Sequence, residues 1–307
     1  MSYNQSHAGI YISKTKLQVV EVVLNENVYR VEYVDEEYFS EFLDFSFKET
    51  KFISLIQSAY NEVVLRHPIK AANVSIALPN SLFKVFQVPI DASLAKVDLV
   101  NHLRWELSVL FPADRGEEYS IRNYQVIDDK QPGSAFAIVV AVYTKYLNLI
   151  HKFCERNNLR LKFIDNEHAA AGNLAFLNKQ KDFNDFNLSL LLDGSNYSIL
   201  CNKGKAPVYF RLNSYKNPQG LIKEIDFDLA RLSKQLNTNM LAVESSVIGN
   251  DLTEGLLEKV RENTGLKLYK INPFEFIEIN EKLRSSSLVV NKFNSFSSAA
   301  GMAFRMV

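Results

Sequence analysis

The feature that most constrains this chain is a strand–turn–strand pattern that occurs twice. Residues 9–21 read Gly-Ile-Tyr-Ile-Ser-Lys-Thr-Lys-Leu-Gln-Val-Val-Glu, which is an apolar run, a polar break and a second apolar run. Residues 190–200 repeat this outline as Leu-Leu-Leu-Asp-Gly-Ser-Asn-Tyr-Ser-Ile-Leu. Short apolar runs that flank a polar turn predict a β-hairpin. The sequence therefore predicts two similar halves, each of which opens on a hairpin.

Composition narrows the class of protein. At 307 residues the chain is long enough for about two domains of roughly 150 residues each. Hydrophobic residues make up 47% of it and charged residues 23%, which favours a packed core over disorder. Its 35 basic and 35 acidic residues balance, whereas a nucleic-acid-binding domain usually carries a basic excess. We therefore expect a globular protein that binds no nucleic acid.

Targeting signals and cysteines bear on the compartment. No apolar run reaches the roughly 18 residues that a membrane span needs, and residues 1–8 lack the apolar core of a signal peptide. Cys154 and Cys201 lie far apart, and neither the cysteines nor the five histidines show metal-binding spacing. The sequence therefore predicts a reduced, cytoplasmic protein without a metal site.

The order of predicted elements is the same in the two halves. Each half reads as three strands, a helix, a strand and a helix, which predicts an α/β fold. In the second half, the apolar residues 240–243 are the expected fourth strand. Within the first half, residues 79–135 interrupt this order of elements and read as an inserted subdomain with a helix at 97–110. The three opening strands are expected at about 10–12, 17–24 and 28–38, and at 188–192, 197–202 and 206–212.

Several short motifs resemble the PilM family of pilus-assembly proteins, which belongs to the actin/Hsp70/hexokinase superfamily. The first hairpin is similar to that family's first hairpin, and Ala77-Leu78-Pro79 is similar to its Ala-Leu-Pro. Arg104-Trp105-Glu106 matches its Arg-Trp-Glu, and residues 298–303 look like its small-residue terminal helix. The cytoplasmic domain of the secretion-system GspL proteins is a related alternative. Order and spacing agree across nearly the whole chain.

The resemblance implies an actin-like (ribonuclease H-like) two-domain fold. It implies a first domain over residues 1–178 that carries the insertion at about 79–135. The second domain is then expected over residues 187–290. The resemblance further implies that a C-terminal helical segment, 291–307, packs back on the first domain.

The residues that bind nucleotide in such a fold are altered here. A phosphate-binding hairpin needs glycines so that backbone N–H groups approach oxygens, and an Asp to position magnesium. The family's Asp, Gly and Lys positions hold Tyr11, Ser13 and Gln18. The Gly-Gly expected after residues 240–243 is replaced by the stretch 244–249, which has one Gly.

The second turn keeps Asp193 and Gly194 but is shorter than the family's turn. These three altered elements make phosphoryl transfer improbable, because that reaction depends on positioning and charge stabilisation. We therefore predict a pseudo-ATPase with no catalytic residues and no required cofactor, while residual binding of ATP and magnesium stays open. Asp165 and Glu167 flank the start of a helix, where the helix dipole alone favours acidic residues. The vestigial nucleotide-binding residues are Ser13, Lys14, Thr15, Lys16, Asp193, Gly194 and Ser195.

The insertion is the expected place for a partner. In the PilM family this subdomain borders a groove that receives a partner's cytoplasmic tail. Arg104, Trp105 and Phe111 are therefore candidate groove residues, although a lone Trp on a helix more often serves packing. A tail of this kind would dock as an extended segment with side chains in apolar pockets.

The function implied by the resemblance is a non-catalytic scaffold of a type IV pilus or related secretion machine. It implies a cytoplasmic protein at the inner face of the cytoplasmic membrane, held there by its partners. Those partners are a PilN-like bitopic membrane protein and the pilus motor ATPases; the oligomeric state is open. Two alternatives remain at this point: a divergent ATP-binding PilM protein, and a sugar- or acid-kinase-like enzyme of the same superfamily.

Overall fold

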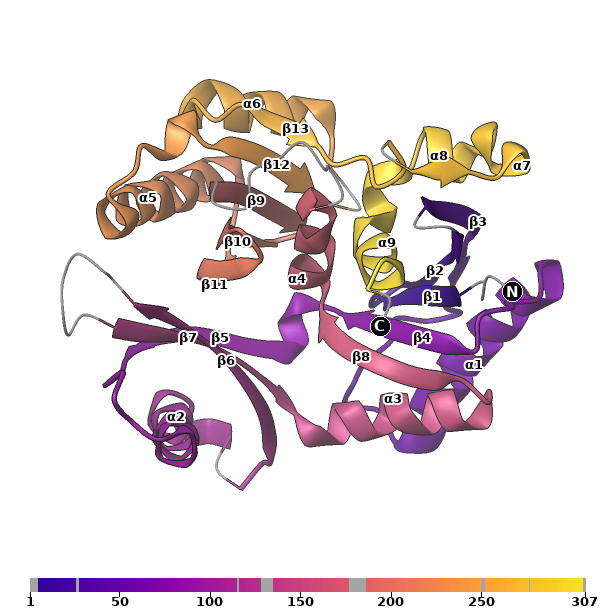
Figure 1. Ribbon diagram of the computed structural model, residues 1–307, viewed down its shortest axis with the longest axis horizontal. Helices are drawn as coiled ribbons and strands as arrows, with labels where there is room; N and C mark the ends of the chain where they lie inside the picture. The colour runs from indigo at the N-terminus through magenta and orange to yellow at the C-terminus, as the bar shows by residue number, and fades with distance from the viewer. Residues whose placement is uncertain are drawn as a thin grey trace.

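The computed structural model describes residues 5–25, 28–114, 116–127, 135–176, 186–249, 252–275 and 277–305. Its strands form three sheets (Figure 1). The two larger sheets share the same order of five strands, and the first sheet has β14 as an additional edge strand. In the first sheet this order is β14-β3-β2-β1-β4-β8, and in the second it is β11-β10-β9-β12-β13. The three-stranded third sheet has the order β5-β7-β6.

The first sheet begins with the hairpin predicted from the sequence. β1 and β2 are antiparallel, β3 follows β2, and β4 and β8 run parallel to β1. Alternate residues of β1 enter two cores: Ile10 and Ile12 face α1 and α3, whereas Tyr11 faces α9. The elements are β1 (Gln5–Ile12), β2 (Lys16–Asn25), β3 (Val28–Tyr38), α1 (Glu49–Arg66), β4 (Asn73–Leu78), α3 (Thr144–Arg156), β8 (Arg160–Asn166) and α4 (Glu167–Gly172).

The second sheet repeats this arrangement. β9 and β10 form an antiparallel hairpin, β11 follows β10, and β12 runs parallel to β9. Helices α5 and α6 cover one face, where their leucines and isoleucines pack on the strands. This repeat confirms the predicted α/β class. The elements are β9 (Phe186–Asp193), β10 (Asn196–Lys203), β11 (Ala206–Ser214), α5 (Pro218–Leu236), β12 (Glu244–Ile248), α6 (Glu254–Thr264) and β13 (Leu268–Lys270).

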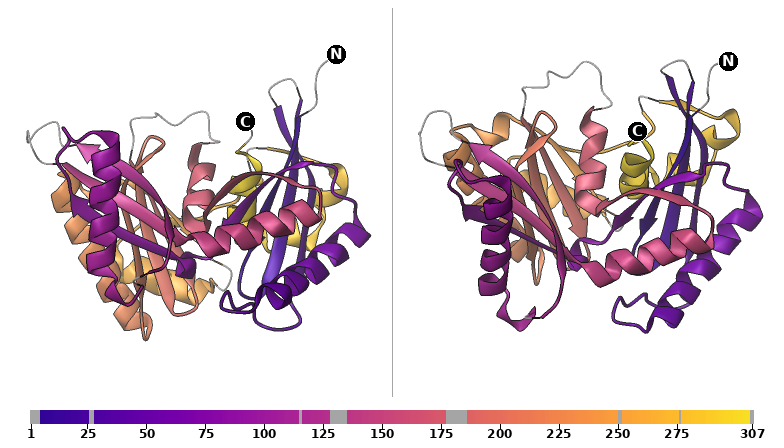
Figure 2. Two further views of the ribbon diagram at one scale, coloured as in Figure 1. Left: turned by 90° about the horizontal axis from the view of Figure 1, so that it is seen from below. Right: turned by 60° about the horizontal axis from the view of Figure 1, so that its bottom comes forward.

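The third sheet is formed by the region where the insertion was expected. It lies beside the second sheet, with α2 on its outer face (Figures 1 and 2). Leu99 and Leu103 of α2 pack on that outer face, and Ile138 of β7 packs against the second sheet. The sheet includes β7 as far as Tyr143, so it extends past residue 135, the expected end of the insertion. The elements are β5 (Phe83–Pro89), α2 (Lys96–Leu110), β6 (Tyr119–Ile127) and β7 (Ala135–Tyr143).

The C-terminal part of the chain returns to the first sheet. β14 pairs with β3 from residue 278, which is earlier than the expected boundary at residue 291. Helix α9 then packs between α4 and β1. Two glycines allow this approach, because a Cβ on Gly9 would lie 1.9 Å from the Ala299 carbonyl oxygen and one on Gly301 would lie 1.9 Å from that of Ala170. The elements are β14 (Glu278–Ile279), α7 (Glu281–Arg284), α8 (Ser287–Val290) and α9 (Ser297–Ala303).

The predicted strand at residues 240–243 was wrong. Residues Met240–Ala242 form a 3₁₀ turn, and the strand is β12, at the position where the adenosine-binding loop was expected. The apolar run favoured a strand locally, but pairing with β9 selects the following residues, and Ser245 and Ser246 are buried there. The other 3₁₀ turns are η1 (Asn80–Leu82), η2 (Pro112–Asp114), η3 (Asn173–Phe176) and η5 (Phe293–Phe296).

Two further sequence expectations concern chain boundaries and membranes. The expected end of the first domain, residue 178, lies outside the described residues. Among the helices that the structure describes, none is long and apolar enough to cross a bilayer.

Candidate functional site

The two hairpin turns face one cleft. The cleft has a volume of about 480 Å³ and is lined from the first sheet, the second sheet and the C-terminal segment. The structure thus brings together residues that are about 180 positions apart in the sequence. All seven predicted nucleotide-site residues line it: Ser13, Lys14, Thr15, Lys16, Asp193, Gly194 and Ser195.

The first turn is closed by its own serine. The amides of Thr15 and Lys16 donate to Ser13 Oγ at 3.1 and 2.9 Å. Ser13 Oγ donates in turn to the Lys16 carbonyl at 3.0 Å, and the Ser13 amide donates to the same carbonyl at 2.9 Å. A phosphate-binding turn would direct such amides at the ligand. Here the Ser13 hydroxyl occupies two of those donors.

The second turn is a tight two-residue connection. Asp193 pairs with Asn196 across it, and Gly194 adopts a φ of +57°, which favours glycine. Tyr215 holds this turn, since its hydroxyl donates to the Gly194 carbonyl and its amide donates to the Ser195 carbonyl at 2.8 Å. Asp193 is the only carboxylate among the described residues that line the cleft.

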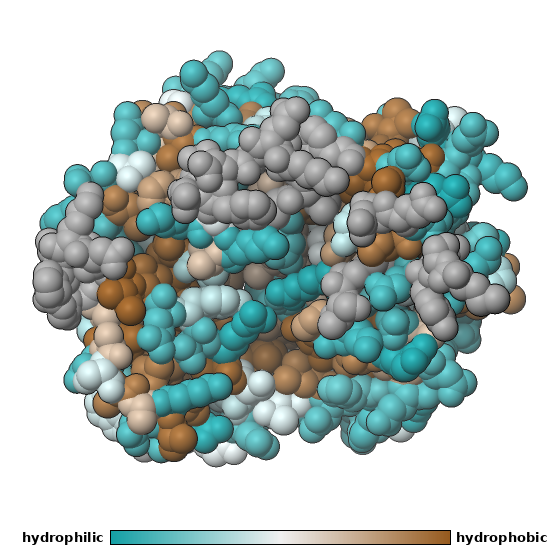
Figure 3. All heavy atoms as spheres, viewed as in Figure 1, coloured by the Kyte–Doolittle hydropathy of each residue, from teal (hydrophilic) through white to brown (hydrophobic). Residues whose placement is uncertain are grey.

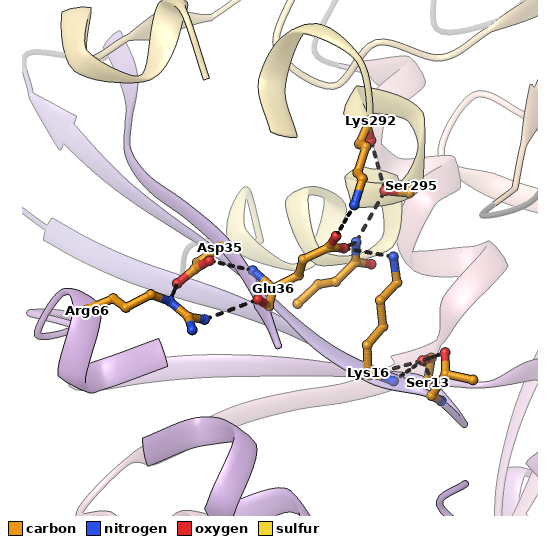
Figure 4. Close-up of polar contacts among 9 residues, drawn as sticks. Ser13, Lys16, Asp35, Glu36, Arg66, Lys292 and Ser295 are labelled. Atoms are coloured by element: carbon orange, nitrogen blue, oxygen red, sulfur yellow. Dashed lines mark hydrogen bonds and ion pairs between the residues drawn. The ribbon is translucent and has the colours of Figure 1, made fainter. Parts of the chain in front are cut away.

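Two of the cleft lysines are bound by one buried carboxylate (Figure 4). Lys16 Nζ and Lys292 Nζ donate to the oxygens of Glu36 at 2.8 and 2.6 Å. Gln18 Nε2 donates to Glu36 as well, at 3.0 Å. Burial opposes ionisation of Glu36, but the hydrogen bonds and charges of the two lysines lower its pKa.

A third lysine is paired at the far side of the cleft. Lys270 donates to Glu254, whose side chain is 63% exposed. Lys14 lies at the tip of the first turn and is exposed. Of the cleft lysines in the described part of the chain, Lys14 is the one without an ion pair to a carboxylate.

Glu167 is a buried carboxylate that the sequence reading treated only as a helix-dipole residue. It is 2% exposed at the start of α4, and it accepts hydrogen bonds from the Tyr11 hydroxyl and from the Asn80 amide, the latter at 2.7 Å. Burial raises its pKa to about 7, and the nearby charge of Asp193 adds to this rise. Tyr11 therefore supplies a proton donor to Glu167.

His168 continues this network into the second sheet. Its ring nitrogens lie 2.6 Å from Ser198 Oγ and 2.9 Å from Ser189 Oγ. Asn80 Nδ2 donates to Ser198 Oγ at 2.9 Å. Complete burial lowers the pKa of His168 to about 3, so the imidazole is neutral. The network joins α4 to both sheets beside the cleft and gives the junction a fixed geometry.

The predicted partner residues lie on and beside α2. Arg104 and Phe111 line a hollow of about 440 Å³ between α2 and β6. Trp105 lies outside it, with 59% of its surface exposed and its ring stacked 6.2 Å from that of His102. Trp105 therefore does not serve the packing role that a lone helical Trp usually has.

A second groove lies on the opposite face of β6. Ser120, Arg122 and Tyr124 line it, whereas Tyr119 and Ile121 line the hollow under α2, as the pleat of a strand requires. Its volume is about 370 Å³, and residues of β5, β7, α3, β8, α4, β10 and β11 also line it. We call it the β6 groove. Apolar and polar surface alternate along the side of the molecule that the third sheet forms (Figure 3).

The β6 groove carries mostly positive charge. Its basic side chains include Arg122, Lys162 and Lys205, and its one carboxylate among the described residues, Asp165, binds Arg305 at 2.5 Å. The sequence analysis missed this groove, because its walls come from elements that are far apart in the chain.

Across the described ranges, no group of three or more His, Cys, Asp or Glu side chains is placed to hold a metal ion.

Comparisons with known proteins concern the fold. No protein-family model matches the chain, and a search of curated proteins also finds no match. A chain of a solved PilM–PilN type IV pilus biogenesis complex is similar, with a TM-score of 0.76 and 16% identity over 97% of this chain and 98% of that chain. The ethanolamine utilization protein EutJ from Carboxydothermus hydrogenoformans is also similar, with a TM-score of 0.50 and 7% identity over 97% and 89% of the two chains.

A Bacteroides thetaiotaomicron VPI-5482 protein described as having an actin-like ATPase fold and unknown function is also found. Its TM-score is 0.49 and its identity 11%, over 96% of this chain and 95% of that one. At sequence identities this low, the structural similarity shows the fold alone and leaves the function open. The chain has the actin-like two-domain fold, and its similarity to the PilM–PilN chain extends over almost its whole length.

Proposed function

We propose that this protein is a non-catalytic cytoplasmic scaffold of a type IV pilus or related secretion machine. The observation that carries the proposal is the near-complete structural match to a chain of the PilM–PilN complex. In this role it binds the cytoplasmic tail of a PilN-like bitopic membrane protein. It sits at the inner face of the cytoplasmic membrane through that partner and contacts the motor ATPases of the machine.

The chemistry of the cleft supports a scaffold that does not hydrolyse ATP. Transfer of a phosphoryl group needs donors and a metal-binding carboxylate aimed at the phosphates. In the first turn two amides are used by Ser13, and at the Asp position Tyr11 donates to Glu167. A scaffold function needs none of these groups.

We propose the β6 groove as the site of the tail. Its length along an edge strand and its mixed lining fit an extended segment, with side chains that alternate between wall and solvent. Arg122 and Lys162 add positive charge to the groove, and the one carboxylate among its described lining residues, Asp165, is bound to Arg305. The occupant is therefore a tail that carries an acidic side chain flanked by apolar ones.

The test uses a PilN-like bitopic membrane protein of the same organism. A synthetic peptide of its cytoplasmic tail is titrated into the full chain by calorimetry. We expect saturable binding with one site, and a loss of at least tenfold in affinity for Arg122→Glu. No heat and no retention in a pull-down would refute the scaffold proposal.

A matched control separates the two hollows beside β6. Arg104→Glu makes the same charge reversal in the hollow under α2, outside the β6 groove. We expect it to bind the tail like the wild type. If Arg104→Glu abolishes binding and Arg122→Glu does not, the tail docks in the hollow under α2 instead, and the assignment to the β6 groove is wrong.

A further inference from the structure

Glu36 lies where the positive charges of the cleft converge. It is on β3, directly across the ladder from Gln18 of β2. Its side chain is only 5% exposed, yet it accepts hydrogen bonds from Lys16, Gln18 and Lys292 at 2.8, 3.0 and 2.6 Å. Figure 4 shows Lys16 and Lys292 pointing at this one carboxylate, from the first turn and from the C-terminal segment.

The two lysines line the cleft, and Glu36 does not. Their ammonium groups are thus at the cleft wall, while the charge that neutralises them lies behind it. Lys16 is 8% exposed in its side chain, so its charge is compensated within the protein and hardly by water. Gln18 Nε2 also donates to Ser295 Oγ at 3.2 Å, which ties the C-terminal segment to this arrangement.

We propose that Glu36 is a built-in counter-anion that prevents the cleft from binding an external polyanion. This inference rests on the proposed non-catalytic role of the cleft and gives it a cause. A diphosphate would bind two converging ammonium groups through charge-assisted hydrogen bonds. It would have to displace a carboxylate that is already tethered in place and loses no translational freedom on pairing. Glu36 therefore excludes the diphosphate by competition from inside the protein.

The same geometry predicts what happens when the charge at residue 36 is removed. A glutamine there leaves two ammonium groups without their carboxylate beside a cleft of about 480 Å³. An uncompensated charge on the buried Lys16 is unfavourable, so Lys16 is expected to turn toward the cleft and to bind an anion there together with Lys292, whose side chain is 48% exposed. The exposed Lys14 at the first turn adds to the attraction at low salt.

The experiment is a titration of inorganic pyrophosphate into the full chain and into Glu36→Gln at low ionic strength. We expect at least tenfold tighter binding by Glu36→Gln than by the wild type, with an affinity that falls as salt rises. The matched control is Glu37→Gln. Glu37 is the next residue of β3, so its side chain is on the opposite face of the strand, where it binds Arg66 at 2.6 Å. It should bind pyrophosphate like the wild type.

Two further variants keep the test decisive. The double variant Lys16→Met, Glu36→Gln removes one of the two released cations, and we expect it to lose the gained affinity. If Glu36→Gln does not fold, Glu36→Asp shortens the carboxylate so that it no longer bridges Lys16 and Lys292, and we expect a smaller gain of the same sign. Equal pyrophosphate affinity in the wild type and in every folded Glu36 variant overturns the proposal, and so does tight binding by the wild type.

The outcome is separable from that of the proposed function. Glu36 lies behind the cleft wall and does not line the β6 groove, which is the proposed site of the tail. Glu36→Gln should therefore bind the membrane-protein tail with wild-type affinity. If the tail binds neither protein but Glu36→Gln gains pyrophosphate binding, the scaffold proposal fails and the counter-anion stands. If both bind the tail and neither binds pyrophosphate, the counter-anion fails alone.

Discussion

The buried carboxyl of Glu167 makes the stability of this protein depend on pH in an unusual direction. Its pKa is raised from 4.5 to about 7, first by burial and then by the charge of Asp193. The folded state therefore keeps this proton at pH values where the unfolded chain has lost it. Because the folded state binds more protons between these two pKa values, the free energy of unfolding falls as pH rises.

The magnitude follows from the shift. A change of 4.5 to about 7 corresponds to about 3 kcal/mol, since one pKa unit is about 1.4 kcal/mol. The favourable contribution of protonated Glu167 is fully present below pH of about 4.5 and is lost by the time the pH has passed about 7. Glu167→Gln carries a permanently neutral, isosteric group that can still accept from the Asn80 amide. The variant should therefore lack this loss.

The assay is urea unfolding of the wild type and of Glu167→Gln at several pH values between 4.5 and 8.5. Other titrating groups contribute equally to both proteins and cancel in the difference. We expect the free energy of unfolding of Glu167→Gln, relative to the wild type, to rise by about 3 kcal/mol across this range. Tyr11→Phe removes a hydrogen bond that favours the charged carboxylate, so it should extend the wild-type loss to higher pH.

A parallel pair of curves would refute this reasoning. If the difference between the two proteins changes by less than about 1 kcal/mol between pH 4.5 and 8.5, Glu167 titrates near its ordinary pKa. Its burial would then be offset by solvent or by a partner at the cleft.

Three further predictions address packing, a buried charge and the cleft. Gly301→Ala should destabilise the fold by roughly 1–3 kcal/mol in thermal unfolding, because its Cβ would meet the Ala170 carbonyl oxygen at 1.9 Å. The control Gly255→Ala has open space around its Cβ and should not destabilise the fold. Similar effects of the two substitutions would contradict the close packing of α9. Asp228→Ala leaves two buried tyrosine hydroxyls and Arg211 without their acceptor. In urea unfolding, the free energy of unfolding should fall by roughly 3–5 kcal/mol. A fall of less than about 1 kcal/mol would mean that these hydrogen bonds contribute little to stability. Millimolar ATP with magnesium should leave the melting temperature unchanged; ligand at a hundred times its Kd adds about 2.7 kcal/mol, so a shift of several degrees would show that the cleft still binds nucleotide.

Much of the fold could be predicted because its signals are local. The hairpin that joins β1 to β2, and its counterpart at β9 and β10, show in the sequence as apolar runs around a polar turn. Residues 190–200 repeat the outline of residues 9–21, so two similar halves followed from the pattern, whereas the actin-like two-domain fold followed from the resemblance. The resemblance also led us to expect the seven hairpin residues in one site, and they do line one cleft.

Long-range contacts decided the rest. The position of β12 depends on its pairing with β9, which no local propensity encodes, and so the strand was expected four residues too early at 240. The contact between Glu36 and Lys292 joins residues 256 positions apart. The β6 groove is lined by residues that extend along the chain from Phe83 of β5 to Phe210 of β11, and by Arg305.

The sequence by itself determined which residues form the strands and turns, because side-chain periodicity reports the burial of each face. It also determined that Ser13 and Tyr11 stand where the resemblance leads us to expect a glycine and an aspartate. Only the tertiary structure decided what the replacements do. Ser13 binds the turn amides, Tyr11 donates to Glu167, and Glu36 neutralises two cleft lysines, because each of these contacts depends on where folding places a partner.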